Sequence, residues 1–408
     1  MGIGRSDSAI TAGMRRLLVA GVAVALGVTV LAVPPAVAGP GAVSGASADA
    51  RATESTSASI RLSRQRVGPG DGLTITSTLA DTVTGDPVTG ASLLLQWQRL
   101  GAPGWLPGEV ASTGARGSAR WQVDPIPESR RYRVVFEGSP GLEPVVSAVA
   151  KVRLKPVLTV SASRDWVRPG ATATVKARVR PAYQGEMLTL QNRVSGVWRD
   201  VRSKRQDAGG GATFSVRGRA TYGPQRYRVV LGERKHHLGV RSRTVRIDTV
   251  RLVTYVIETR GKVKGALPSF RRRSAEIYAD PRGWSRADVH FKRVSSGGMF
   301  SLVLSQAKYV PTFAPICDRY WSCRVGRYVI INENRWRQGT PYFKSAGGTL
   351  RQYRAMVVNH ETGHWFGLGH ATCGGKGQPA PVMMQQSKGL YGCSPNAWPL
   401  AWEISRAR

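Results

Sequence analysis

The feature that most constrains this chain is the stretch from His360 to His370, which reads H-E-x-x-H-x-x-G-x-x-H. Residues four apart lie on one face of an α-helix, so His360 and His364 can direct two imidazoles at a single cation. Gly367 lets the helix end and the chain turn, because glycine enters left-handed conformations without a Cβ penalty. That turn can bring His370 round as a third ligand. Three nitrogen ligands leave one tetrahedral position open, so the stretch predicts a catalytic zinc site.

Glu361 follows the first histidine directly. At that position a carboxylate can hold a water molecule on the metal without itself being a ligand, and we predict Glu361 as the catalytic residue. The alternative is a degenerate site that binds metal without cleaving a substrate, or that binds no metal.

A second piece, Pro381-Val382-Met383-Met384, follows the last histidine of the stretch. Together the two pieces resemble the metzincin branch of zinc metalloproteases, in which a methionine turn lies beneath the metal. The resemblance implies Zn²⁺ as the cofactor and a turn that contains Met383 and Met384. It also implies amide hydrolysis, with Glu361 accepting a proton from the attacking water and passing it to the leaving nitrogen. Tyr391 is the nearest tyrosine after the turn, and the second oxyanion donor stays unassigned.

The surrounding residues are similar to a family of secreted actinobacterial proteins whose domain has no known function. The similarity covers residues 250–400 approximately and says little about substrate. Its matching pieces are Val358-Asn359-His360-Glu361-x-Gly363-His364, Pro379-Ala380-Pro381-Val382-Met383-Met384-Gln385-Gln386 and Gly392-Cys393-x-Pro395-Asn396-x-Trp398-Pro399.

Residues 1–38 are typical of a secretory signal peptide. Arg15 and Arg16 form a basic start, residues 17–33 are apolar, and Ala36-Val37-Ala38 has the small-x-small form of a cleavage site. The apolar run is also at the short edge of a transmembrane span, so an uncleaved membrane anchor is the alternative. Residues 39–54 are rich in Ala, Gly and Ser and are predicted to be a disordered linker. We expect the protein to be secreted or associated with the cell envelope.

Residues 55–249 contain two copies of one pattern. Arg66-Val67-x-Pro69-Gly70 returns as Trp166-Val167-x-Pro169-Gly170, and Arg131-Tyr132-Arg133-Val134-Val135 returns as Arg226-Tyr227-Arg228-Val229-Val230. Short alternating runs between Gly, Pro and Asp turns predict two antiparallel β-sandwiches, at residues 55–155 and 156–249. They resemble the immunoglobulin-like (Ig-like) modules of bacterial secreted proteins. We expect either a stalk that spaces the catalytic end from the envelope, or a module that adheres to a wall polymer.

Residues 250–408 change to a mixed pattern. Strands are expected at 253–259, 289–294, 300–304 and 328–332, and helices at 268–280 and 350–368, the latter begun by a capping box of Thr349 and Gln352. The expected fold class is therefore multidomain, with two antiparallel β-sandwich (Ig-like) modules followed by an α+β metzincin-like zinc peptidase domain. A substrate peptide is expected along an exposed edge strand, with 300–304 or 328–332 as the candidates.

Four cysteines lie in the C-terminal part, which in an exported chain implies disulfides with three possible connectivities. We favour Cys317–Cys323, which closes a small loop, and Cys373–Cys393, which ties the segment after His370 to the segment after the methionines. Cys373 as a zinc ligand is the weaker alternative.

The chain is strongly basic, with 59 Lys and Arg against 25 Asp and Glu and a formal charge of +34. Such a balance indicates an anionic partner, or a solvated surface that keeps the protein soluble. No nucleic-acid-binding motif accompanies it, so no specific nucleic acid is expected. The two functions that remain are a secreted zinc endopeptidase acting on protein or cell-wall peptides, and a non-catalytic adhesin that binds an anionic wall polymer. Arg234, Lys235, His236 and His237 would face that polymer. The adjacent His236 and His237 share no helix face and are not predicted as metal ligands.

Overall fold

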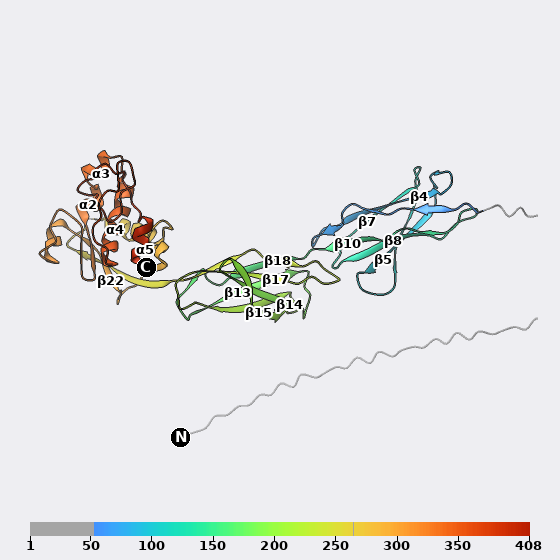
Figure 1. The fold of residues 1–408 in the computed structure, drawn as a ribbon, viewed down its shortest axis with the longest axis horizontal. Coiled ribbons are helices and arrows are strands. Elements are labelled where there is room, and N and C mark those ends of the chain that lie inside the picture. Colours follow the sequence, from blue (N-terminus) through green and yellow to red (C-terminus); the bar gives the residue numbers. More distant parts are fainter. Residues whose placement is uncertain (1–52, 264) are drawn as a thin grey trace, which may run out of the picture. The chain divides into compact units, whose positions relative to one another are not determined.

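The computed structural model describes residues 53–263 and 265–408 (Figure 1). The predicted signal peptide at 1–38 and the linker up to residue 52 lie outside the described residues. The linker's last residue, Glu54, donates a backbone hydrogen bond to the Gly141 carbonyl at 2.9 Å. Along the described residues, no helix is both long and apolar enough to cross a membrane.

The first repeat forms two sheets over one hydrophobic core. The buried positions of its strands alternate, as in Leu73, Ile75 and Leu79 of β4, because successive side chains point to opposite faces of a strand. The strands are β1 (Thr56–Ala58), β2 (Arg61–Leu62), β3 (Arg66–Val67), β4 (Leu73–Asp81), β5 (Ser92–Arg99), β6 (Leu106–Ser112), β7 (Ser118–Val123), β8 (Arg130–Phe136), β9 (Val145–Val146) and β10 (Ala150–Leu154). One sheet has the order β1-β4-β2 with β7 on β4, and the other has the order β3-β10-β8-β5-β6 with β9 on β8.

The second repeat has nearly the same topology. Its sheets have the orders β11-β13-β16 and β12-β19-β17-β14-β15, with β18 on β17, and they enclose a core of their own. The strands are β11 (Val157–Ala162), β12 (Trp166–Val167), β13 (Thr172–Arg180), β14 (Met187–Val194), β15 (Val197–Arg205), β16 (Gly211–Arg217), β17 (Gly223–Leu231), β18 (Val240–Arg241) and β19 (Val245–Thr249). Tyr132 and Tyr227 occupy equivalent positions in the two repeats, and each is buried in the core of its repeat.

The C-terminal part contains a five-stranded sheet of order β21-β20-β22-β24-β23. Its strands are β20 (Arg251–Arg260), β21 (Val289–Arg293), β22 (Phe300–Ser305), β23 (Cys323–Val325) and β24 (Tyr328–Asn332). All pairs are parallel except β23 with β24, which is antiparallel. Every residue of β22 is buried, as expected for an inner strand covered on both faces.

Helices connect and cover this sheet. They are α1 (Leu267–Ala279), α2 (Glu333–Gln338), α3 (Pro341–Ser345), α4 (Leu350–Trp365) and α5 (Ala401–Ala407), with 3₁₀ turns at Trp284–Ala287 and Ala307–Thr312. The predicted capping box is confirmed, because Thr349 and Gln352 bond each other's backbone N–H groups at the start of α4. Helix α4 ends three residues before the predicted position, and Gly367 follows with a φ of 91°.

The predicted fold class is wrong for this chain. We expected two antiparallel β-sandwich (Ig-like) modules and then an α+β metzincin-like zinc peptidase domain, whereas the described residues are mostly strand, from β1 to β24, with little helix. The prediction relied on the clear helical pattern of α4 and took the rest of residues 250–408 to be similarly rich in helix. Only α1 and α4 exceed two helical turns in the described part. Glycines and prolines, dense between residues 367 and 399, stop helices and leave long irregular connections there.

Candidate metal centre

Helix α4 presents His360 and His364 one turn apart, at the wall of a cleft. Their Nε2 atoms lie 3.1 Å from each other. The left-handed conformation of Gly367 turns the chain back, and this return places the Nε2 atom of His370 3.2 Å from that of His364. Donors around a tetrahedral zinc ion at roughly 2.0–2.1 Å lie about 3.3 Å apart, so this set of three imidazoles fits such an ion.

The other ring nitrogens orient two of these imidazoles. Nδ1 of His360 donates to the Val382 carbonyl at 2.8 Å, and Nδ1 of His364 donates to the Leu368 carbonyl at 2.8 Å. A proton held on Nδ1 leaves the lone pair on Nε2, which is the tautomer that a metal ligand needs.

The environment favours neutral imidazoles. Burial, with the adjacent His364 and His370, lowers the pKa of His360 to about 3. Burial also lowers the pKa of His364 and of His370, and for His370 the Lys388 ammonium adds to the effect. Neutral imidazoles are competent ligands, since a proton on Nε2 would compete with the metal.

Glu361 lies beside the ligands, with 5% of its surface exposed. Burial raises the pKa of its carboxyl to about 8. No ion pair or hydrogen bond engages this carboxyl within the described part of the chain, so it is not committed to a structural partner. A carboxyl with a pKa near neutrality, on the wall of the cleft, is suited to general acid–base work.

The cleft at the three histidines has a volume of about 550 Å³. Two cationic side chains, Arg324 and Lys388, belong to its lining, and the buried Nε of Arg324 has no hydrogen-bond partner in the part of the chain that the structure describes. The rest of the wall includes Ile316, Asp318, Trp321, Gln385 and Ser387. The cleft therefore offers positive charge close to the candidate metal ligands.

The methionine segment lies beneath α4. Met383 and Met384 are buried, and the Met383 thioether packs against Gly363 of α4. After His370 the chain pairs with this segment, as Ala371 donates to the Met383 carbonyl at 3.1 Å. The third histidine and the methionine segment are thus joined by backbone.

Glu403 on α5 is a site residue that sequence reasoning missed. Its buried carboxylate accepts N–H bonds from Met383 at 2.8 Å, Val382 at 3.1 Å and Leu400 at 2.6 Å. Because the Val382 carbonyl in turn orients His360, Glu403 supports both the methionine segment and a candidate ligand. The only local signal was a lone acidic residue in a short amphipathic segment near the C-terminus.

Both favoured disulfides are confirmed. Cys317 and Cys323 are joined, and so are Cys373 and Cys393. The second bond closes a loop that also contains the methionine segment, and Ala380 donates to the Ser394 carbonyl at 3.0 Å within it. The weaker alternative, Cys373 as a zinc ligand, is excluded because its sulfur is used in the disulfide.

The expectation that a substrate peptide pairs along residues 300–304 or 328–332 is wrong. Strands β22 and β24 are inner strands, so neither can accept a peptide at its edge, and β23 is the edge strand beside the cleft. Tyr391 is 80% exposed and is not part of the cleft wall. Strand order depends on long-range pairing, which the local pattern of a strand does not encode.

Comparisons with known proteins leave the activity unassigned. Residues 223–399 match a family model described as "Protein of unknown function (DUF3152)". No curated protein matches the chain. Similar solved structures include the adhesin InvE of Yersinia pseudotuberculosis, with 15% identity, a TM-score of 0.28, and coverage of 48% of this chain and 59% of that chain. Another is a tetra-tandem repeat in the extending region of a large adhesion protein, with 13% identity, a TM-score of 0.30, and coverage of 49% and 51%.

Proposed function

We propose that this chain is a zinc-dependent hydrolase of amide bonds, with His360, His364 and His370 as the zinc ligands and Glu361 as the general base. The observation that supports this most strongly is the meeting of three Nε2 atoms beside a buried carboxyl. His364 Nε2 lies 3.1 Å from that of His360 and 3.2 Å from that of His370, and among the described residues no group pairs with the Glu361 carboxyl. A purely structural metal would need no such uncommitted acid at its side, and structural zinc sites are usually closed by a fourth protein ligand.

Bound zinc would supply a Lewis acid for the scissile carbonyl and lower the pKa of water in the open position. Glu361 then takes the proton from the attacking water and returns it to the leaving nitrogen. The Val382 and Leu368 carbonyls keep the His360 and His364 rings turned toward the reacting centre throughout. Cys373–Cys393 limits the movement of the segment that carries His370.

The substrate of this proposal is a peptide with an acidic group near the scissile bond. Strand β23 leaves one edge available for pairing with an extended peptide, and Arg324 on this strand also lies in the cleft wall. Arg324 and Lys388 would then bind a carboxylate of the substrate, because a partly buried guanidinium gains most from a charged acceptor. Acidic proteins and carboxylate-rich stem peptides of a cell wall both carry such groups.

The proposed location is outside the cytoplasm, in secreted or envelope-associated form. Two disulfides favour an oxidising compartment, and residues 1–38 have the composition of a signal peptide. Membrane attachment would require that this segment stay uncleaved.

The deciding experiment is cleavage of a mixed peptide library by the purified chain, with and without a chelator. Chelator-sensitive cleavage that zinc restores is expected, with acidic residues enriched next to the cut. No cleavage by zinc-loaded protein under any condition would defeat the proposal. The zinc content, measured in parallel, distinguishes a site that holds zinc but is inactive from a site that holds no zinc.

A second candidate function is adhesion to an anionic wall polymer, and strand β15 favours it. This strand forms one edge of its sheet and exposes Arg199, Arg202, Lys204 and Arg205. Polymer binding through this edge should weaken steeply with salt and be unaffected by Glu361→Gln. Replacing Arg199 and Arg202 by Ala should weaken it, whereas retention of binding in that variant would remove this candidate.

A further inference from the structure

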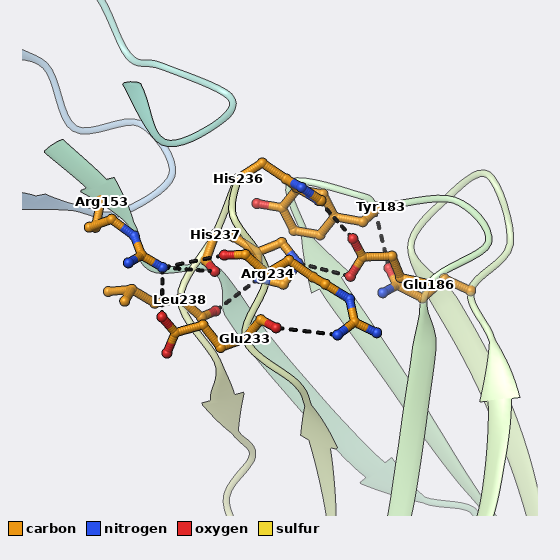
Figure 2. Close-up of polar contacts among 9 residues, drawn as sticks. Arg153, Tyr183, Glu186, Glu233, Arg234, His236, His237 and Leu238 are labelled. Atoms are coloured by element: carbon orange, nitrogen blue, oxygen red, sulfur yellow. Dashed lines mark hydrogen bonds and ion pairs between the residues drawn. The ribbon is translucent and has the colours of Figure 1, made fainter. Parts of the chain in front are cut away.

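A second set of potential ligands lies in the second repeat, far in sequence from α4. Glu186 lies in the turn before β14, and His236 and His237 lie in the hairpin between β17 and β18 (Figure 2). Nε2 of His236 lies 2.7 Å from one Glu186 oxygen, and Nε2 of His237 lies 2.8 Å from the other. The three ligand atoms are all within 4.8 Å of one another.

His237 has acceptors at both of its ring nitrogens. Its side chain is fully buried, and Nδ1 lies 3.0 Å from the Leu238 carbonyl, which can only accept. With the Nδ1 proton donated there, the neutral ring turns the Nε2 lone pair toward a carboxylate oxygen. Two lone pairs that face each other need a cation between them, and either a proton or a metal ion can fill this role.

The Glu186 carboxylate contacts the imidazoles of His236 and His237. Although the chain carries 59 Lys and Arg, no Lys or Arg forms an ion pair with Glu186 within the described residues. Other carboxylates of the repeats, such as Glu233 and Asp248, do pair with arginines. An arginine at this position would neutralise the carboxylate and occupy the space of an ion.

The hairpin that carries the histidines is held from outside the cluster. Arg153 on β10 donates to the Arg234 carbonyl at 3.3 Å, the His237 carbonyl at 3.4 Å and the Glu233 carboxylate at 2.8 Å (Figure 2). The Tyr183 ring packs on His237 with centroids 4.3 Å apart. The ligand atoms are therefore positioned by contacts that do not depend on the ion.

We propose that Glu186, His236 and His237 form a binding site for a divalent transition metal, zinc foremost. A carboxylate with two imidazoles is a donor set that zinc accepts, and water can complete the tetrahedron. Each Glu186–imidazole distance must lengthen to about 3.3 Å, a change of about half an ångström, which the partly exposed side chains of Glu186 and His236 can make. The ion would tie the turn before β14 to the β17–β18 hairpin. This site does not depend on the proposed hydrolase activity.

The test measures zinc in the full-length chain after dialysis, in a His360→Ala background that removes a candidate ligand of the other site. The expected result is about one equivalent of zinc per chain. Adding Glu186→Gln should lower the zinc content at least tenfold. Asp248→Asn is the matched control, because it changes a carboxylate of the same repeat that pairs with Arg246 and not with the cluster. It should leave the zinc content unchanged.

Co²⁺ provides a second readout that does not depend on activity. Tetrahedral Co²⁺ absorption should develop in His360→Ala and be lost with Glu186→Gln or His236→Asn. Far-UV circular dichroism confirms that each variant is folded. A folded His360→Ala chain without zinc, or a Glu186→Gln variant with unchanged zinc, would overturn the proposal and leave an ion pair in its place. A zinc difference between the wild type and His360→Ala reports on the other site separately.

Discussion

The thioether of Met383 packs directly against Gly363 in the middle of α4. A Cβ at Gly363 would collide with the Met383 sulfur and would lie 3.0 Å from Trp284. Met383 is fully buried among other core residues, so moving its thioether would disturb their packing. The methionine segment and the helix that carries His360 and His364 therefore approach each other closely only because residue 363 has no side chain.

Gly363→Ala should destabilise the chain although alanine favours helices. Overpacking of this kind costs about 1–3 kcal/mol, more than the ~1 kcal/mol gained in helix propensity. Urea unfolding followed by tryptophan fluorescence measures the change. Gly369→Ala is the matched control and should be nearly neutral, because no atom of the described residues lies within 4 Å of a Cβ there. Equal stability of the two variants would contradict the packing argument.

Glu403→Leu should weaken both the fold and zinc binding. Its carboxylate accepts three backbone N–H bonds, and a leucine would leave those donors without a partner at a cost of about 1–3 kcal/mol each. Because Val382 orients His360, zinc affinity should fall about 10–100-fold. Competition with a zinc-binding dye measures it. Glu403→Gln retains one carbonyl acceptor, so its zinc affinity should lie between those of the wild type and Glu403→Leu. Wild-type zinc affinity in Glu403→Leu would show that Glu403 does not support the site.

Glu361→Gln should retain zinc and lose turnover. The amide has the same shape but cannot accept the proton, so kcat should fall by about 10²–10⁴-fold with the KM little changed. Equal zinc content with unchanged kcat would show that another group acts as the base.

In metal-free protein, the Glu361 carboxyl should contribute a loss of stability as the pH rises from about 4 to about 8. The lowered pKa values of His360, His364 and His370 act with the opposite sign, because those groups add stability as the pH rises, so the contribution of Glu361 is obtained by comparison with a variant. The unfolded Glu361 carboxyl ionises near pH ~4.3, whereas burial raises its folded pKa to about 8, so in this interval the folded state holds one proton more. Stability from this group is thus fully present below the lower value and is lost toward the upper one. In thermal unfolding with chelator, the stability of the wild type relative to Glu361→Gln should fall across this range. A difference between the two proteins that stays constant with pH would contradict the raised pKa of Glu361.

Arg324→Ala should reduce kcat/KM for acidic peptides selectively. One charged hydrogen bond is worth about 1.5 kcal/mol, which corresponds to a reduction of about tenfold. Competition between an acidic peptide and its amide analogue measures the change, and the analogue should be cleaved equally by the two proteins. Parallel losses for both peptides would indicate a structural role for Arg324.

Local patterns accounted for much of the candidate centre. The four-residue spacing of His360 and His364, the Thr349 cap and the turn at Gly367 all depend on neighbours within a helical turn or two, and backbone geometry alone relates such residues. Cysteine number and position narrowed the disulfides to a few pairings, among which Cys317–Cys323 and Cys373–Cys393 are found.

By itself, the sequence determined where α4 starts, which residues face the candidate metal and which segments alternate as strands. Only the tertiary structure decided that strands dominate the chain, that β23 is the edge strand, that Glu403 supports the methionine segment and that Glu186 meets His236 and His237. The physical reason is the distance along the sequence between the residues that interact. Helix periodicity and caps arise from contacts between near neighbours, whereas strand order and the meeting of residues fifty positions apart depend on how whole sheets and loops pack, which no local pattern encodes.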